Sequence, residues 1–255
     1  MADDLELALE LVDVADAITL ERFGAADLVV EAKPDLTPVT EADRAVEHAL
    51  RERLGAARPQ DSMVGEEFGV STAPDSERRW IIDPIDGTKS YVRKIPIWAT
   101  LLALQEGPEI TVAVVSAPAL ARRWWARRGT GAFTDDGRRI GVSAVSELAD
   151  AQLLWGGIED WDAVGRPDAV LELARSCWRS RGIGDFWQYM LVAEGAAEVA
   201  LDPVVSVWDL AAPMLIVEEA GGRFTDLSGR RTPDGGDAIA TNGVLHDAAL
   251  AVVRR

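Results

Sequence analysis

The chain has 255 residues, which is enough for one large domain or for two smaller ones that share an interface. Its 43 acidic and 26 basic residues give a net charge of −17, which argues against nucleic acid and anionic membranes as partners. The single cysteine, Cys177, excludes an internal disulfide and favours a reducing compartment.

Neither a signal peptide nor a membrane span is predicted. The opening residues, MADDLELALE, lack the basic segment and the apolar core of a signal peptide. No apolar run approaches the ~20 residues that cross a bilayer. We therefore expect a cytoplasmic protein.

The first half of the sequence predicts helices followed by an antiparallel sheet. Apolar residues at helical spacing predict a helix over 3–23, and a second helix begins near 40–43 and ends at Gly55. Short apolar runs at 63–64 and 80–82 are typical of strands. Three further extended segments, separated by Gly or Pro turns, predict an antiparallel meander: 97–105, 109–116 and 122–127.

After about residue 143 the predicted helices and strands alternate, as in an α/β protein. Strands are expected at 153–155, 178–181, 197–201, 222–226 and 237–241. Helices are expected at 168–177, 185–194, 209–220 and 244–253. Because no linker rich in Pro, Gly or Ser separates the halves, we predict two closely packed subdomains: an α+β subdomain over 1–142 and an α/β subdomain over 143–255.

The stretch WIIDPIDGTKSY, residues 80–91, carries the strongest functional pattern. Asp83 and Asp86 lie three residues apart at the end of an apolar strand. Pro84 fixes one backbone angle, and the turn it imposes can direct both carboxylates and the Ile85 carbonyl into one small volume. Two carboxylates that close repel each other unless a cation or a shared proton lies between them.

The residues that follow add features of a phosphate site. Gly87 allows close approach of the backbone to a ligand, and the amides of Gly87 and Thr88 can bind phosphate oxygens. The only histidines, His48 and His246, lie in polar helical contexts where a structural or solvated role is expected. A metal bound here therefore needs oxygen ligands, which favours Mg²⁺ or Mn²⁺.

Phosphatases of the haloacid dehalogenase type have a motif similar to residues 83–88. Their motif, Asp-x-Asp-Gly-Thr, places two acids two residues apart near the start of the chain, and the first acid is the nucleophile. Here the acids are three residues apart and the motif begins at Asp83. This spacing and position disfavour an aspartyl-phosphate mechanism.

Three other acidic segments are ambiguous when each is taken alone. Glu66 and Glu67 follow a strand and a glycine, as in a solvated turn. Asp209 stands at the start of an apolar helix, where an acid favours the helix dipole. Thr40 and Asp43 fit a capping box at the start of a helix.

Taken together, in this order and at these spacings, the motifs resemble those of the inositol monophosphatase family of Mg²⁺-dependent, lithium-sensitive phosphatases. The resemblance reaches from the first helix to beyond Asn242-Gly243, nearly the whole chain. The segments that carry it are 40–43, 65–67, 80–88, 208–212 and 218–222. It implies a sandwich of alternating α-β-α-β-α layers and a homodimer.

The resemblance also implies a site with two or three Mg²⁺ ions, or with Mn²⁺ in their place. Glu66, Asp83 and the Ile85 carbonyl correspond to ligands of one ion. Asp83, Asp86 and Asp209 correspond to ligands of a second, and Glu66 also faces a weaker third. Such a pair of ions assists the in-line attack of a water on a phosphate, so no protein nucleophile is needed.

Further residues are assigned to water and substrate by the same resemblance. Thr88, paired with Asp43, corresponds to the dyad that orients the attacking water. The amides of Gly87 and Thr88 correspond to the phosphate site, and Asp86 and Asp209 also face the substrate. The expected partner is therefore a small phosphorylated molecule.

The segment RGIGDFWQY, residues 181–189, bears on the choice of substrate. Gly184-Asp185 followed by aromatics is similar to the histidinol-phosphate phosphatases of the family, whereas inositol monophosphatases usually carry small residues here. Asp185 can pair with the cationic amine or imidazole of histidinol, unless it only caps its helix. We therefore expect hydrolysis of L-histidinol phosphate.

Two alternatives to this activity stay open. One is an inositol-1-phosphate or 3′-nucleotide phosphatase of the same family. The other is a regulatory protein on this fold, since one bacterial relative acts with the transcription machinery. Lys89 is left without a role, and the Trp124-Trp125 pair is expected in the core or at a subunit interface.

Overall fold

The computed structural model describes residues 3–34, 36–74 and 76–254. The helices are α1 (Asp4–Arg22), α2 (Glu41–Ala57), α3 (Thr88–Val92), α4 (Ile158–Ala163), α5 (Pro167–Ser176), α6 (Asp185–Ala193), α7 (Val207–Glu219) and α8 (His246–Val253). The strands before residue 142 are β1 (Val30–Ala32), β2 (Pro38–Thr40), β3 (Ser62–Gly65), β4 (Gly69–Ser71), β5 (Arg78–Asp86), β6 (Ala99–Glu106), β7 (Glu109–Ala117), β8 (Arg122–Arg127) and β9 (Gly131–Thr134). Those after it are β10 (Gln152–Trp155), β11 (Arg179–Gly182), β12 (Val199–Asp202), β13 (Arg223–Thr225) and β14 (Ala238–Thr241).

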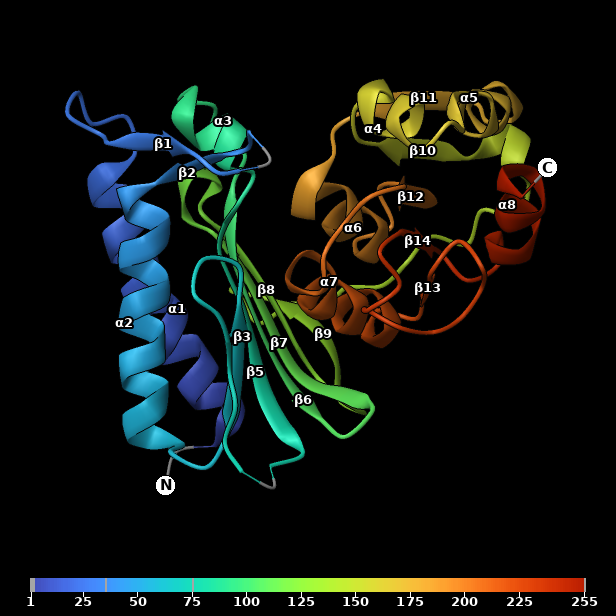
Figure 1. Cartoon of the computed structure of the whole chain (residues 1–255). Helices are drawn as coiled ribbons and strands as arrows, with labels where there is room; N and C mark the ends of the chain where they lie inside the picture. The colour runs from blue at the N-terminus through green and yellow to red at the C-terminus, as the bar shows by residue number, and fades with distance from the viewer. Residues whose placement is uncertain (1–2, 35, 75, 255) are drawn as a thin grey trace.

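Helices and sheets alternate in five layers (Figure 1). In the described residues, the first sheet has the order β4-β3-β5-β6-β7-β8-β9, in which only β3 and β5 pair in parallel. The second sheet has the order β11-β10-β12-β14-β13 and mixes parallel with antiparallel pairs. The predicted α-β-α-β-α sandwich is therefore confirmed. The predicted antiparallel meander corresponds to β6, β7 and β8, and β5 and β9 extend it on either side.

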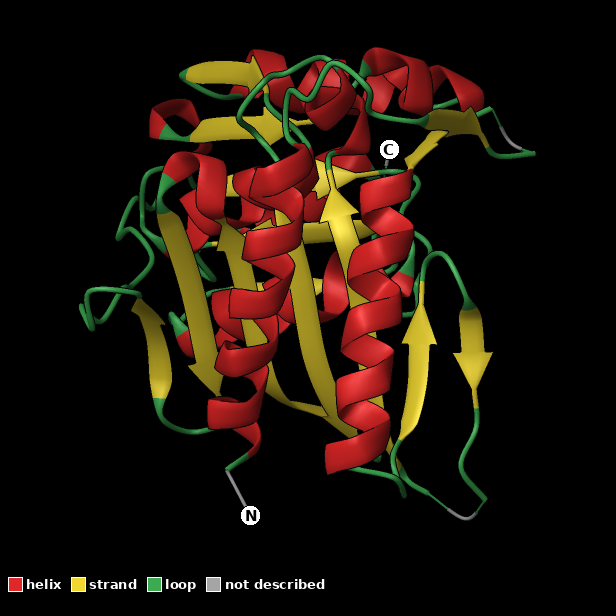
Figure 2. Cartoon of the chain, turned by 90° about the vertical axis from the view of Figure 1, so that its left-hand side faces the viewer, coloured by secondary structure: helices red, strands yellow, loops and turns green. Residues whose placement is uncertain are grey.

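The outer layer next to the first sheet consists of α1 and α2. Figure 2 shows them side by side across the face of this sheet. Leu11 of α1 and Leu50 and Leu54 of α2 are fully buried and pack against Trp80 of β5. Side chains at helical spacing thus cover one face of the sheet, as the apolar pattern predicts.

The central layer consists of α6 and α7, which lie between the two sheets (Figure 1). Met190 of α6 and Leu215 of α7 belong to one buried cluster with Leu101 of the first sheet and Ala200 of the second. The first residues of both helices therefore end up beside the carboxyl end of β5. The division into subdomains 1–142 and 143–255 stays a prediction, and residues 1, 2 and 255 lie outside the described chain.

Every helix and strand predicted above is present, with ends that differ by a few residues. The hairpin of β1 and β2, the strands β4 and β9 and the short helices α3 and α4 were not predicted. β1 and β4 are exposed along their whole length, so their sequences carry no alternation of apolar and polar residues.

The tryptophan pair and His246 lie within the packed structure, whereas His48 is exposed. Trp124 is fully buried, and Trp125 stacks on Phe133 with ring centroids 4.6 Å apart, which agrees with a place in the core. His246 is buried and hydrogen-bonded to two threonine hydroxyls, at 2.9 and 3.0 Å, while His48 is exposed. In the part of the chain that the structure describes, no helix is both long and apolar enough to span a bilayer.

Candidate active site

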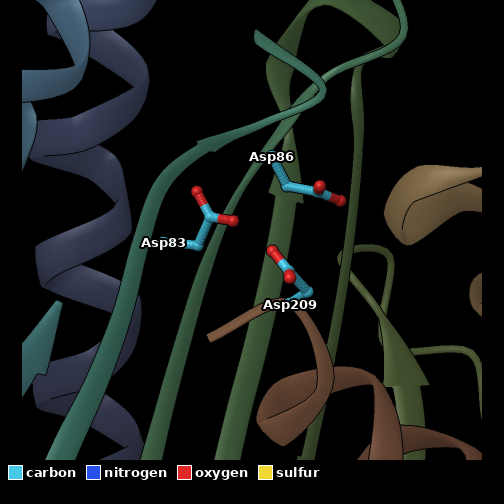
Figure 3. A group of neighbouring side chains, drawn as sticks. All are labelled: Asp83, Asp86 and Asp209. Carbon is cyan, nitrogen blue, oxygen red and sulfur yellow. The ribbon is translucent and has the colours of Figure 1, made fainter. Parts of the chain in front are cut away.

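A β-bulge in β5 brings its two acids together. The pairing of β5 with β6 shifts register between Asp83 and Asp86. In a regular strand, residues three apart point to opposite faces, whereas a bulge re-aims the side chains that follow it. Thr100 stabilises the bulge, because its hydroxyl donates to the Pro84 carbonyl at 2.8 Å. Figure 3 shows both carboxylates close to that of Asp209, which comes from the start of α7.

Asp209 of α7 completes a group of three carboxylates. Figure 3 shows the three side chains together. Asp83, Asp86 and Asp209 each offer an oxygen within 4.8 Å of the others. Asp209 also accepts a hydrogen bond of 2.7 Å from the Ser206 amide, so it caps α7 and faces the group at once. The capping and the functional interpretations of this acid are therefore compatible.

Burial and repulsion between neighbouring acids raise the pKa values of all three carboxyl groups. Burial raises the pKa of Asp83 well above its usual value, and the charges of Glu66, Asp86 and Asp209 add to the effect. Burial also raises the pKa of Asp86, together with the charges of Asp185 and Asp209. The pKa of Asp209 rises to about 6, mainly through burial and against the Ser206 hydrogen bond.

The three carboxylates fit a divalent cation. The Oδ1 atom of Asp83 is buried and has no hydrogen-bond partner among the described residues. A bound cation would satisfy this oxygen and offset the repulsion between the acids. Carboxylate oxygens are the ligands that Mg²⁺ and Mn²⁺ prefer.

Asp43 and Thr88 meet beside this group. One oxygen of Asp43 accepts hydrogen bonds from the Thr40 amide and hydroxyl, at 2.8 and 2.5 Å. Its other oxygen lies 3.3 Å from the Thr88 hydroxyl, which also lies 2.9 Å from the Ile85 carbonyl. Burial raises the pKa of Asp43 to about 6, although the bonds from Thr40 oppose the shift. The capping box and the predicted dyad thus occur together.

Gly87 occupies a position that no other residue type fits easily. Its φ of +84° is left-handed. A Cβ at this position would lie 2.9 Å from the Ile97 carbonyl oxygen and 3.3 Å from a carboxylate oxygen of Asp185. The glycine therefore lets the turn after β5 lie directly against the backbone that precedes β6 and against Asp185 at the start of α6.

Glu66 lies near the three acids but outside their group, and it has a cationic partner. The Nζ atom of Lys33 lies 2.7 Å from Glu66 Oε1 and 2.6 Å from Glu67 Oε1. Burial alone would lower the pKa of Lys33, but the hydrogen bonds to Glu66 and Glu67 outweigh it and raise this pKa. Lys33 was not predicted, because it lies between β1 and β2, in a segment without apolar periodicity.

Asp86 and Asp209 line a cleft of about 920 Å³ between the two halves of the chain. Asp185, the first residue of α6, lines this cleft with a left-handed φ of +51°. Desolvation by the cleft walls raises the pKa of Asp185 to about 6, while the charge of Lys89 opposes the shift. The next amide, that of Phe186, donates to Asp86, so this segment is anchored on the acid group.

Asp202 is an acid of the cleft that was not predicted. It is 8% exposed and accepts hydrogen bonds from the Tyr189 hydroxyl, at 2.7 Å, and from Gln188. Burial raises its pKa to about 7. A signal was present, because Asp202 precedes a proline at the end of an apolar strand, as Asp83 does.

Comparison with known proteins identifies the class. The profile of the inositol monophosphatase family matches residues 1–255, so the chain belongs to this family and the resemblance seen in the motifs is confirmed. A histidinol-phosphatase of Streptomyces coelicolor is 53% identical, over 99% of this chain and 97% of that protein. A histidinol-phosphatase of Mycobacterium tuberculosis is 55% identical, over 97% and 96%. The crystal structure of the extragenic suppressor protein suhB from Bartonella henselae superposes with a TM-score of 0.91 at 27% identity, over 100% and 99%.

Proposed function

We propose that this protein is a metal-dependent phosphomonoesterase that hydrolyses L-histidinol phosphate to L-histidinol and phosphate, in histidine biosynthesis. The observation that carries the proposal is the identity of 53–55% with proteins named histidinol-phosphatase, over nearly the full length of each. The carboxylates of Asp83, Asp86 and Asp209 are all present and grouped, as a phosphatase of this family requires.

The acid group is the proposed metal site. Asp83, Asp86 and Asp209 would hold Mg²⁺, with Glu66 and the Ile85 carbonyl as further ligands. Two or three such ions, or Mn²⁺ in their place, supply positive charge to the phosphate and acidify a water molecule. The unpaired Oδ1 of Asp83 and the raised pKa values of these acids support this assignment.

Protein groups around the metal site orient the water and the phosphate. We infer that Asp43 and Thr88 position the attacking water, because Asp43 is itself held by two hydrogen bonds from Thr40. The amides of Gly87 and Thr88 are the proposed phosphate donors. Lys89 lines the cleft beside them and adds positive charge where the phosphate would lie.

The other wall of the cleft suits a cationic leaving group. Asp160, Asp185 and Asp202 line it. Gly156 lies among these acids, and a Cβ there would come within 3.0 Å of an Asp202 carboxylate oxygen. Histidinol carries an amine and an imidazole that can pair with these carboxylates, whereas inositol carries no charge. This wall therefore supports histidinol phosphate over inositol phosphate.

We also propose that the protein is a cytoplasmic homodimer. Trp178, which precedes the edge strand β11, is 66% exposed. Large exposed aromatic side chains are typical of surfaces that bind a second protein. Light scattering of the wild type and of Trp178→Ser tests the proposal: a dimer that the substitution weakens supports it, and a monomeric wild type contradicts it.

The test of the substrate is the release of phosphate from L-histidinol phosphate and from inositol-1-phosphate, with Mg²⁺ and with EDTA. We expect an EDTA-sensitive preference for histidinol phosphate. In Asp185→Asn, the side chain keeps its shape and tolerates the left-handed backbone, but its charge is lost. Loss of a charged hydrogen bond costs about 1.5–3 kcal/mol, so kcat/KM for histidinol phosphate should fall about 10- to 100-fold.

The matched control is Asp162→Asn, an exposed acid of α4 outside the cleft lining, which should change neither substrate. Use of inositol-1-phosphate by Asp185→Asn should change by less than about threefold, because no charged pair is lost. Equal use of both substrates by the wild type would contradict histidinol phosphate as the substrate, and would leave Asp185 as no more than the start of α6.

A further inference from the structure

Glu47 is a buried acid that the mechanism above does not use. It lies on α2 about one helical turn after Asp43 and has no exposed surface. Burial of a carboxylate is costly unless hydrogen bonds or a cation compensate it. The partners of Glu47 therefore indicate what the acid is for.

These partners belong to the turn that carries Glu66. Glu47 Oε2 accepts a hydrogen bond of 2.7 Å from the Glu67 amide, and Oε1 accepts one of 3.2 Å from the Phe68 amide. The Nε atom of Arg51, one helical turn further on, lies 2.7 Å from Oε1. The carboxylate thus joins α2 to the turn between β3 and β4.

Gly65 shows how closely the acid approaches this turn. A Cβ at Gly65 would lie 2.0 Å from Glu47 Oε1 and 2.4 Å from its carboxyl carbon, so any side chain there would displace the carboxylate. On the other side of the turn, the Glu66 amide donates to the Ile82 carbonyl of β5 at 3.3 Å. The backbone of Glu66 is therefore fixed between Glu47 and the strand that carries Asp83.

We propose that Glu47 is a positioning residue that holds the Glu66-Glu67 turn in the geometry needed for metal binding. The inference rests on the proposed metal-dependent function. The position of Glu47 requires a side chain that only accepts hydrogen bonds, because two amides and a guanidinium all donate to its carboxylate. Successive turns of α2 then serve one site: Asp43 orients Thr88, and Glu47 orients Glu66.

The test compares Glu47→Gln with Glu52→Gln, an exposed acid on the same helix. Gln has nearly the shape of Glu, but its amide group would face the donors of the turn. Mn²⁺ binding, measured by electron paramagnetic resonance without substrate, should weaken at least 10-fold in Glu47→Gln and less than twofold in Glu52→Gln. The Mg²⁺ concentration for half-maximal phosphate release should rise in parallel, while KM for the substrate stays within about twofold.

A second variant covers the case in which Glu47→Gln does not fold. Arg51→Lys keeps the positive charge but loses the planar Nε–H donor that fixes Glu47 Oε1, and it should weaken Mn²⁺ binding about threefold. If a folded Glu47→Gln binds Mn²⁺ like the wild type, the proposal is wrong, whatever the change in melting temperature. If Glu47→Gln is not folded, wild-type Mn²⁺ binding by Arg51→Lys overturns it. A wild type that neither binds Mn²⁺ nor responds to Mg²⁺ would instead contradict the proposed function.

Discussion

The helix α7 has acids at both ends, and the two sets differ in whether basic side chains pair with them. At its start, Asp209 faces Asp83 and Asp86, and within the described residues none of these three forms an ion pair with a basic side chain. At its end, Glu218 lies 2.7 Å from Arg128 Nη1 and 2.6 Å from Arg231 Nε. Carboxylates are thus grouped without cationic partners at the start of α7 and paired with arginines at its end.

The helix dipole explains part of this difference. The start of a helix favours negative charge, so Asp209 is stabilised there, whereas acids at the end of a helix are disfavoured. Arginines compensate Glu218, and the amides of Gly129 and Gly131 compensate Glu219, at 2.9 and 2.8 Å. The dipole cannot account for three carboxylates whose oxygens lie within 4.8 Å of one another. We infer that the first cluster, formed by Asp83, Asp86 and Asp209, binds a cation. The second cluster, around Glu218 and Glu219, links the two halves of the chain.

The largest effect that separates the two clusters is expected from Asp83→Asn. The substitution keeps the shape of the side chain but removes a proposed metal ligand, so kcat should fall at least about 1,000-fold, equivalent to about 4 kcal/mol. Without metal, the melting temperature should stay the same or rise, since one of three repelling charges is gone. Phosphate release and thermal unfolding in EDTA measure the two effects. Near-normal turnover would show that Asp83 is not a metal ligand.

The response to Mg²⁺ and pH is the next largest effect. The pKa of Asp209 is about 6 in the folded protein against 3.8 as its usual value, so the folded state binds protons more tightly than the unfolded state. Through this group, the metal-free protein loses stability as pH rises from about 4 to about 6, and the loss is complete above that range. Mg²⁺ held by these acids would relieve the repulsion, and below pH 6 it would have to displace protons.

The gain in melting temperature on adding Mg²⁺ should therefore depend on pH. At pH 7.5 and 100 times Kd, binding contributes about 2.7 kcal/mol, or roughly 5–10 °C for a protein of this size. At pH 5 the gain should be less than half of that. The measurement is thermal unfolding with Mg²⁺ and with EDTA at both values. Equal gains at pH 5 and 7.5 would mean that the ion binds away from these carboxylates.

The sequence predicted the acids of the first cluster in two ways. Asp83 and Asp86 follow a local signal, because they end an apolar strand around a proline, whereas Asp209 is ambiguous alone and was assigned through the resemblance to the family. The bulge that turns Asp83 and Asp86 to one side was not predicted, because it depends on the pairing of β5 with β6. Motif and spacing thus reveal which residues act together, while their directions depend on neighbouring strands.

Glu47 and Lys33 show what sequence patterns could not reveal. In the helical pattern of α2, Glu47 is indistinguishable from an exposed polar residue. Its burial is favourable only because the turn at residues 65–68 provides amides that donate to its carboxylate. Lys33 lies in the loop between β1 and β2, and its partners Glu66 and Glu67 come from the turn between β3 and β4. Both residues depend on contacts between segments about 20 to 30 positions apart, which hydrophobic periodicity does not record.

The smallest effect is expected at the second cluster, from Glu218→Gln. Gln keeps hydrogen-bonding capacity but loses the charge that pairs with Arg128 and Arg231, so unfolding should become easier by about 1–2 kcal/mol. For a chain of this size the melting temperature should fall by roughly 2–8 °C. Turnover and its Mg²⁺ dependence should stay within about twofold, because Glu218 lies nine residues along α7 from Asp209, or about 14 Å.

The control for this prediction is again Glu52→Gln, which removes one exposed acid and should leave the melting temperature within about 1 °C, since exposed charges contribute little. The decisive comparison is with Asp83→Asn, because the two substitutions should act in opposite directions. One should remove activity without lowering stability, and the other should lower stability without removing activity. A Glu218→Gln protein that stays stable but no longer responds to Mg²⁺ would contradict this division, since the acids at both ends of α7 would then belong to one electrostatic unit.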